Sequence, residues 1–340
     1  IVVLANGGAV EMPWVPLPKV ILESYLLGEA GGEAVVDLIF GKASPCAKLA
    51  ETFPERQSDL LAEIYFPGTR HNVQYREGLC VGYRYFDTVH KPVLFPFGHG
   101  LSYTTFEYTN LKLGLAKNKV HVQFDLTNTG TFAAKEIVQI YIHDVSSSVF
   151  RPEHELKDFC KVKLDPGETK SVELVLPESS FAIYDVGAKD WVVEAGDFEI
   201  RVAASSRDIR LRGTATLPSD QVVSRLAKES YPPVQRIPEH IDDLTFANRF
   251  TDSKAIVLSE IEVLETLKLF HRNSLLKEVA HTRWFGKLLL KIVFSQAARE
   301  VKPGPAQRRE KRMVKATVKN LPLRALVLFS NGGMSFEVLD

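Results

Sequence analysis

The sequence predicts a chain of α/β plus all-β class that ends in a helical extension. Residues 1–101 mix a short apolar run, helical spacing and turn signals, which is typical of an α/β region. Residues 102–217 alternate apolar and polar side chains over short runs, which indicates β-strands. Residues 218–340 begin with prolines and continue with helical spacing. At 340 residues the chain is too long for one ordinary domain, so these regions are expected to be separate parts.

The first region is predicted from its amino end onward. Residues 1–4 form a β-branched apolar run, typical of a parallel strand covered on both faces, and residues 6–8 supply a turn. Residues 20–27 carry apolar side chains at helical spacing. Residues 35–41 predict a helix terminated by glycine, and residues 53–100 predict a long ordered loop region.

The second region predicts a β-sandwich. Alternation of apolar and polar residues recurs at 120–126, 172–176 and 198–202. Turn-forming residues separate these runs at positions 128–130, 165–167 and 195–197. Short alternating strands with such turns, over roughly a hundred residues, favour two packed antiparallel sheets.

The last region is predicted to be a linker followed by helices. Prolines at 232, 233 and 238 mark the linker, and helical spacing follows at 256–269 and 275–294. A basic run contains Arg308, Arg309, Lys311, Arg312 and Lys315. Because the whole chain is neutral, we interpret this run as a solvated helix face or loop and not as a nucleic-acid contact.

Composition and charge narrow the classes of protein. Hydrophobic residues make up 45% and charged residues 25% of the chain, which is typical of a globular protein. Lys and Arg number 42, as do Asp and Glu, so nothing in the net charge attracts nucleic acid or an anionic membrane. No apolar run is long enough to cross a bilayer. We therefore expect neither nucleic acid nor a membrane as a partner.

The cysteines indicate neither a metal site nor a disulfide framework. Cys46, Cys80 and Cys160 are far apart, odd in number and outside any zinc-ligand spacing. We interpret them as buried reduced thiols, which fits a cytoplasmic protein. No metal and no cofactor are expected.

Both ends of the sequence predict a piece of a longer protein. The chain begins directly with an apolar strand at Ile1, without Met or a polar lead-in, and shows no signal peptide. It stops at Asp340 inside a stretch that reads like the opening of a helix.

Five motifs occur in series over the first hundred residues: VVLANGGAVEMPW, GEAGGEAVVDLIFG, KLAETFP, YREGLCVGYRYFD and LFPFGHGLSYTTFEY. Together they resemble the C-terminal half of glycoside hydrolase family 3, especially its bacterial β-glucosidases. Residues 102–217, with ELKDFCKVKLDPGETKSVEL, resemble the fibronectin type III-like domain of that family, and LPLRALVLFS resembles part of a helical extension found in one bacterial branch. The resemblance implies part of an α/β sandwich domain with a connecting loop at 1–101, a fibronectin type III-like (immunoglobulin-like) β-sandwich at 102–217, and a linker with helical extension at 218–340.

The resemblance also implies an activity whose catalytic groups lie elsewhere. In this family a barrel domain supplies an Asp nucleophile and a loop of the α/β sandwich domain supplies a Glu acid/base, which together cleave β-glucosides or oligosaccharides with retention. No segment of this sequence matches either motif, so no catalytic residue is assigned to the chain. We expect the enzyme to bind its substrate through the barrel, and this chain alone to be inactive.

A polar and aromatic cluster in the loop region supplies the substrate-cleft candidates, Tyr75, Arg76, Glu77, Arg84 and Asp87. Sugars bind to aromatic faces and to bidentate polar groups, so these residues are candidates for the border of a cleft. The alternative interpretation is an ion-pair network that fastens the loop to the β-sandwich.

Other conspicuous residues are given structural interpretations. Glu29 and Glu33 are four apart but fit a helix amino end, where they complement its dipole. We interpret His99, between glycines, as a hydrogen-bonded junction residue, and Trp191 as a core residue. The family usually has glycine before its Lys-Leu pair, where this chain has Ala47, so a Cβ is expected where the backbone favours positive φ.

Two alternatives from other classes remain open. One is a free-standing β-sandwich that binds carbohydrate or a protein partner. The other is a nucleotide-binding α/β enzyme, although a dinucleotide site requires G-x-G-x-x-G directly after its strand and the sequence has only Gly7-Gly8 there. One strand cannot complete a parallel sheet, so we predict exposed apolar surface along residues 1–4.

Overall fold

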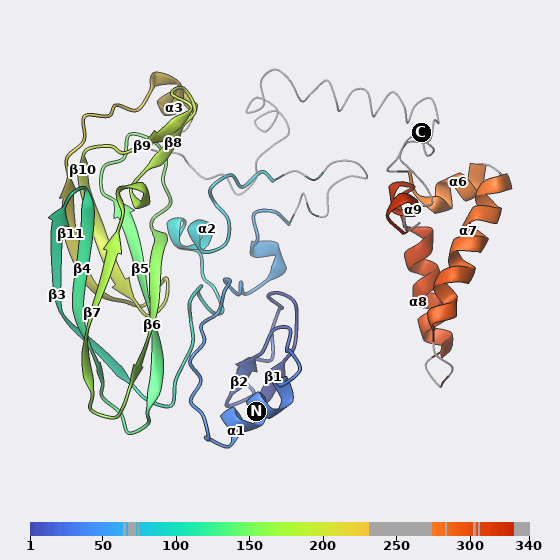
Figure 1. Cartoon of the computed structure of the whole chain (residues 1–340), viewed down its shortest axis with the longest axis horizontal. Helices are drawn as coiled ribbons and strands as arrows, with labels where there is room; N and C mark the ends of the chain where they lie inside the picture. The colour runs from blue at the N-terminus through green and yellow to red at the C-terminus, as the bar shows by residue number, and fades with distance from the viewer. Residues whose placement is uncertain are drawn as a thin grey trace. The chain divides into compact units, whose positions relative to one another are not determined.

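The computed structural model describes residues 1–63, 66, 73, 75–230, 274–282, 284–301, 304 and 307–329. The chain divides into two compact units, of which the first comprises residues 1–66 and 74–242 and the second residues 67–73 and 243–340. The first unit contains the β-sandwich and the segment before it, and the second contains the C-terminal helices (Figure 1).

The amino-terminal segment forms a small parallel sheet, which is followed in the chain by one helix. Strand β1 (Val2–Leu4) pairs in parallel with β2 (Ile21–Glu23), and α1 (Gly31–Ile39) follows. The helical spacing of residues 20–27 was therefore a wrong indication, because β2 is extended by its pairing with β1. Ile1 is 67% and Val3 40% exposed, which confirms the predicted exposed apolar surface but not the expected cover on both faces.

The loop region between the small sheet and the sandwich contains two short helices that its sequence pattern did not predict. These are the 3₁₀ helix η1 (Gln57–Asp59) and helix α2 (Tyr83–Thr88). Gly78 and Gly82 have positive φ values of 57° and 58°, so the turns before α2 use backbone conformations that favour glycine. Six residues give too short a helix to show a period in the sequence.

The β-sandwich consists of two antiparallel sheets, shown in green to yellow in Figure 1. One sheet has the order β3-β4-β7 and the other β11-β10-β5-β6. Their bounds are β3 (Phe106–Ala116), β4 (Lys119–Asn128), β5 (Ala134–Asp144), β6 (Glu155–Leu164), β7 (Thr169–Leu176), β10 (Gly196–Ala203) and β11 (Ile209–Leu217). Between β7 and β10 lie the 3₁₀ helix η2 (Glu178–Ser180) and the hairpin of β8 (Ile183–Asp185) and β9 (Asp190–Val192), and α3 (Arg225–Ser230) follows the sandwich.

The sandwich core follows the alternation seen in the sequence. Along β4 every second side chain from Val120 to Leu126 is fully buried, while Gln123 is exposed. Ile140 and Ile200 belong to the other sheet and are buried in the same cluster. Two inner faces of alternating apolar residues therefore form the core, as expected for packed antiparallel sheets.

The described part of the second unit is helical. It comprises α6 (Leu276–Thr282), α7 (Trp284–Ala297), η3 (Ala298–Glu300), α8 (Gln307–Lys319) and α9 (Arg324–Phe329). Helices α6 and α7 confirm the helical spacing of residues 275–294, whereas the linker prolines and residues 256–269 lie outside the described residues. The basic run lies on α8, where its side chains are exposed. Over the part of the chain that the structure describes, no helix has the length and apolar character needed to span a bilayer.

Candidate functional site

The structure places the five predicted cleft residues in different environments around α2. Tyr75 is 80% exposed, whereas Arg76 and Asp87 are only 4% and 6% exposed. Glu77 is half-buried, and its Oε2 is buried without accepting a hydrogen bond from the described residues. Arg84 is half-buried on α2. Their role in a substrate cleft stays a prediction, and only some of them are accessible in this chain.

Asp87 is held by residues of the β-sandwich. Its Oδ1 accepts a hydrogen bond from Arg207 Nε at 2.6 Å, and its Oδ2 lies 3.2 Å from His154 Nε2. Burial raises the pKa of Asp87, but hydrogen bonds from His154 and Arg207 outweigh it and hold the pKa below its ordinary value. The carboxylate is therefore ionised and ties α2 to the sandwich.

The partners of His154 fix which of its nitrogens carries hydrogen. Arg201 Nη1 lies 2.8 Å from His154 Nδ1, and arginine can only donate. His154 Nδ1 is therefore the acceptor, and Nε2 carries the hydrogen that it donates to Asp87. The guanidinium of Arg201 is in turn paired with Glu153 at 2.9 Å. This chain of partners connects α2 to β10.

Tyr83 is the aromatic centre of the same junction. Its ring stacks on Phe97 at 4.8 Å and on His154 at 5.9 Å, and its hydroxyl accepts a hydrogen bond from the backbone of Leu156 at 2.8 Å. Burial raises the pKa of Tyr83, so the hydroxyl stays protonated at neutral pH. The guanidinium of Arg84 lies 5.2 Å from the centre of this ring.

The FGHG turn after α2 requires both of its glycines. Gly98 has φ +77°, and a Cβ there would collide with the amide of Gln139, which donates a hydrogen bond to the Gly98 carbonyl at 3.1 Å. A Cβ on Gly100 would collide with the carbonyl oxygen of Ala47. Ala47 is not among the described residues with positive φ, so the expectation of strain at this alanine was wrong. Glycine is needed at position 100 because the backbone of Ala47 lies too close for a Cβ there.

A buried ion pair fastens the KLAETFP segment to the sandwich. Lys48 Nζ lies 3.0 Å from Glu136 Oε1, with side-chain exposures of 11% and 5%, and also donates to the Gly100 carbonyl at 2.9 Å. The hydroxyl of Tyr108 donates to Glu136 at 3.0 Å, and burial followed by the Glu136 charge raises the pKa of Tyr108. This carboxylate therefore serves as the anchor of a loop.

His99 lies in the FGHG turn, close to the Lys48–Glu136 ion pair. Its ring stacks on Phe95 at 5.3 Å. Burial, followed by the positive charge of Lys48, lowers the pKa of His99, so the ring is neutral at pH 7. Its backbone carbonyl accepts a hydrogen bond from Leu49 at 2.8 Å. The position at the junction agrees with the structural interpretation, although the hydrogen bond involves the backbone.

Trp191 is 62% exposed, so its interpretation as a core residue was wrong. It lies on β9, where its ring packs edge-to-face against Tyr184, itself 51% exposed, at 5.7 Å. A three-residue strand at the end of the sandwich offers few core positions. Glu29 and Glu33 are exposed, and Glu33 lies in the first turn of α1, where a carboxylate complements the helix dipole.

The cysteines form no reactive or metal-binding group within the described residues. All three are free. Cys80 is buried, whereas Cys46 and Cys160 are only half-buried, so the expectation of buried thiols was wrong for these two. Burial raises the pKa of Cys160 to about 11, so it is a thiol at neutral pH. No group of three or more potential metal ligands occurs in the described ranges.

The junction between α2, the preceding loops and the sandwich uses its buried carboxylates to hold the loops in place. Its carboxylates Asp87 and Glu136 are both occupied by cations and hydroxyl or imidazole donors of the same chain. Sequence reasoning selected Asp87 but missed His154 and Arg207. These lie 67 and 120 residues away from Asp87, and no local pattern marks such distant partners.

Comparison with known proteins identifies the class. Residues 1–103 match the glycosyl hydrolase family 3 C-terminal domain, and residues 136–206 match the fibronectin type III-like domain. The matched regions of the chain are therefore the C-terminal domain of glycosyl hydrolase family 3 and the fibronectin-like sandwich that follows it.

Individual relatives refine this placement. Thermostable beta-glucosidase B of Acetivibrio thermocellus is 40% identical over the whole chain, which covers 40% of that protein. Exo-alpha-(1->6)-L-arabinopyranosidase of Bifidobacterium breve is 45% identical over 65% of the chain, which covers 29% of it. The crystal structure of the Bifidobacterium adolescentis GH3 beta-glucosidase aligns with a TM-score of 0.62 and 43% identity over 68% of this chain and 36% of that one. The chain thus spans well under half the length of these relatives.

Proposed function

We propose that this chain is the non-catalytic C-terminal part of a retaining β-glucosidase-type hydrolase. The enzyme cleaves the O-glycosidic bond of β-glucosides with an Asp nucleophile and a Glu acid/base. Both carboxyl groups lie in the portion of such enzymes that this chain does not match. The observation that carries the proposal is the match of the entire chain to 40% of a β-glucosidase at 40% identity.

The use of the buried carboxylates supports the proposal. A retaining glycosidase needs two carboxyl groups about 5 Å apart that face one sugar-sized cavity. Asp87 and Glu136 are buried, but each is paired with a cation inside the chain. Neither is free to attack an anomeric carbon or to carry a mobile proton, so their role is to hold loops in place.

The loop before α2 is the part of this chain that we propose to border the substrate cleft. Tyr75 is 80% exposed, and Glu77 has a buried carboxylate oxygen that accepts no hydrogen bond from described residues. An exposed aromatic face beside a carboxylate suits a sugar. Asp87 and Arg84 lie on α2, directly after this loop, where Asp87 pairs with Arg207 and Arg84 lies over the Tyr83 ring.

A chimera tests the proposal directly. The matched portion of the Acetivibrio thermocellus enzyme is replaced by this chain, and hydrolysis of p-nitrophenyl β-glucoside is measured. We expect turnover by the chimera and none by this chain alone or by the remaining portion alone. Turnover by this chain alone, or a soluble and folded chimera without activity, contradicts the proposal. An α-L-arabinopyranoside as second substrate distinguishes the specificity named for the Bifidobacterium breve relative.

The exposed aromatic pair favours a second candidate, a carbohydrate-binding role for the sandwich. Trp191 and Tyr184 present adjacent rings on the β8–β9 hairpin, and sugars stack on such rings. Isothermal titration with glucose and cello-oligosaccharides tests it. Saturable binding that Trp191→Ala abolishes supports a binding module, and no detectable heat rules it out.

A further inference from the structure

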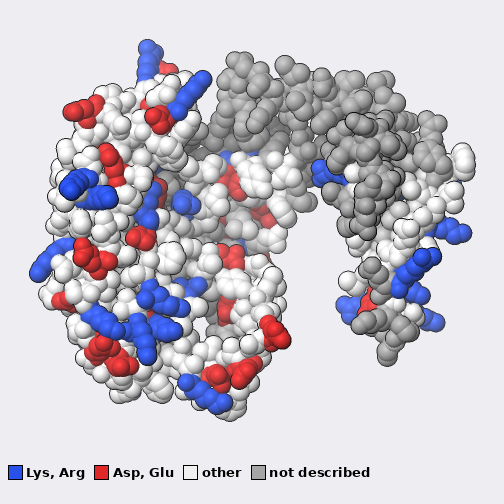
Figure 2. Space-filling view, in the orientation of Figure 1, with Lys and Arg blue, Asp and Glu red and all other residues white. Residues whose placement is uncertain are grey.

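The helical segment at residues 274–329 is more basic than the chain as a whole. Residues 274–329 contain thirteen Lys and Arg against three Glu, although the whole chain has 42 of each sign. Figure 2 shows blue side chains spread over the described helices of this unit, while both colours alternate over the sandwich. Such a predominantly positive surface attracts anions.

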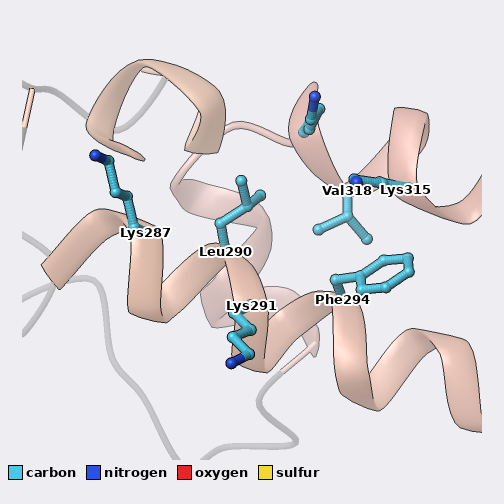
Figure 3. A pocket seen from close by; sticks show the side chains of 7 residues that line it. Lys287, Leu290, Lys291, Phe294, Lys315 and Val318 are labelled. Carbon is cyan, nitrogen blue, oxygen red and sulfur yellow. The ribbon is translucent and has the colours of Figure 1, made fainter. Parts of the chain in front are cut away.

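A groove lies between α7 and α8 within this unit. It has a volume of about 340 Å³, and its apolar lining consists of Leu290 and Phe294 from α7 and Val318 from α8. Figure 3 shows Phe294 and Val318 pointing toward each other across the space between the two helices. The volume is that of a small-molecule site, and the lining suits an alkyl chain or a ring.

Four lysines surround this lining. Lys287 and Lys291 come from α7, and Lys315 and Lys319 from α8, and all four are exposed. Lys287 leaves α7 on the same side as Leu290, whereas Lys291 leaves it on the opposite side (Figure 3). Within the described ranges no carboxylate lies within ion-pair distance of these ammonium groups. Like charges gathered around an apolar surface are relieved when an anion binds between them.

We propose that the α7–α8 groove binds an anionic amphiphile, a single small molecule with an apolar body and a carboxylate, sulfate or phosphate head. A purely apolar ligand would not require the lysines, and a hydrophilic anion would not require the apolar lining. The two features together select a molecule that carries both. Val318 is 3% exposed and shapes the inner wall, while the long, exposed lysine side chains at the rim supply the positive charge that attracts the head group.

This ligand site is separate from sugar cleavage. The Acetivibrio thermocellus relative matches the whole chain, whereas the Bifidobacterium breve relative matches 65% of it. The family 3 domain match covers residues 1–103, which include neither α7 nor α8. Failure of the ligand experiment therefore leaves the proposed hydrolase assignment intact, and the reverse also holds.

A ligand series at equal chain length tests the proposal on the full chain. Isothermal titration below the critical micelle concentration compares dodecanoate, dodecylammonium and a neutral dodecyl oligoethylene glycol, with acetate as the head group alone. We expect dodecanoate to bind at one site, and the other three to bind at least about tenfold more weakly. Equal binding of the neutral and anionic tails, or equal binding of acetate, overturns the proposal.

Charge-matched variants locate the site. The double variant Lys291→Glu/Lys319→Glu is expected to weaken dodecanoate binding about tenfold. The control Arg308→Glu/Lys311→Glu makes the same charge change on α8 outside the groove and is expected to change affinity less than about threefold. Far-UV circular dichroism confirms that both variants are folded. An equal loss in both variants overturns the proposal.

Two further outcomes would assign the groove to another occupant. Lysine-dependent dimerisation in sedimentation velocity, without dodecanoate binding, would identify a second copy of the chain. Binding to phosphatidylglycerol vesicles without binding to monomeric dodecanoate would identify a membrane-surface site. Either result refutes a small-molecule site.

Discussion

Replacing Asp87 by asparagine should open the junction between α2 and the β-sandwich. Both groups that face this carboxylate are donors, Arg207 Nε at 2.6 Å and His154 Nε2 at 3.2 Å. An amide has only one oxygen, so its NH₂ group must face one of the two donors. Hydrogen bonds to charged groups contribute about 1.5–3 kcal/mol each. Because the Arg207 side chain is 33% exposed, water replaces part of its contact, and we expect a total loss of about 3 kcal/mol.

The loss should depend on pH in a defined direction. The folded-state pKa of Asp87 lies below its ordinary value, so the folded protein favours the ionised form more than the unfolded chain does. Its contribution is therefore fully present above the unfolded pKa, about 3.9, and disappears as pH falls through the lower folded value. Wild type and Asp87→Asn should differ at pH 7 and converge as pH falls below about 4.

Urea unfolding followed by far-UV circular dichroism measures the difference, and amide hydrogen exchange across residues 83–100 locates it. Asp220→Asn is the matched control, because it makes the same chemical change at an exposed position. It should shift the free energy of unfolding by less than about 0.5 kcal/mol. If Asp87→Asn unfolds at the wild-type urea concentration at pH 7, Asp87 does not hold α2 on the sandwich. An equal effect of Asp220→Asn would lead to the same conclusion.

Three further changes have outcomes set by the same structure. Glu136→Gln should lower the free energy of unfolding by about 3 kcal/mol in urea, because it leaves the Lys48 ammonium buried without its charge partner; a neutral effect would show that this pair is not buried in solution. Gly98→Ala should cost about 3 kcal/mol in the same assay, since it combines positive φ with a collision against Gln139, and retention of wild-type stability would contradict the turn geometry. Trp191→Ala should change the free energy of unfolding by no more than about 0.5 kcal/mol in thermal denaturation, and a large loss would return this residue to the core.

Side-chain periodicity predicted the helices and strands that are determined by their own local sequence. Alternation at residues 120–126 became the buried face of β4, and the turn residues at 165–167 connect β6 to β7, with Gly167 at φ +75°. The apolar spacing of residues 35–39, ended by Gly41 at φ +70°, became α1. In each case the side-chain period and the turn chemistry indicated the same element.

Elements held by distant partners could not be predicted in this way. Strand β2 has three residues, and its extended form follows from pairing with β1, so helical spacing at residues 20–27 was misleading. Helix α2 is short and is fixed by Asp87, whose partners are remote in sequence. A sequence pattern does not show which donor meets which carboxylate across 67 or 120 residues. The same limit applies to the α7–α8 groove, because its lysines come from two helices.

The first unit has one region whose buried polar groups are paired, around α2, and one with exposed apolar side chains, around the small sheet. This difference bears on the function of the unit. Around α2 the buried polar groups of Asp87, His154 and Arg201 find partners within the chain. Around the small sheet, Ile1 is 67% and Leu26 82% exposed, and two paired strands of three residues leave open edges. Exposed apolar side chains beside open strand edges need cover from further protein. That need supports the proposal that this chain is the C-terminal part of a longer hydrolase.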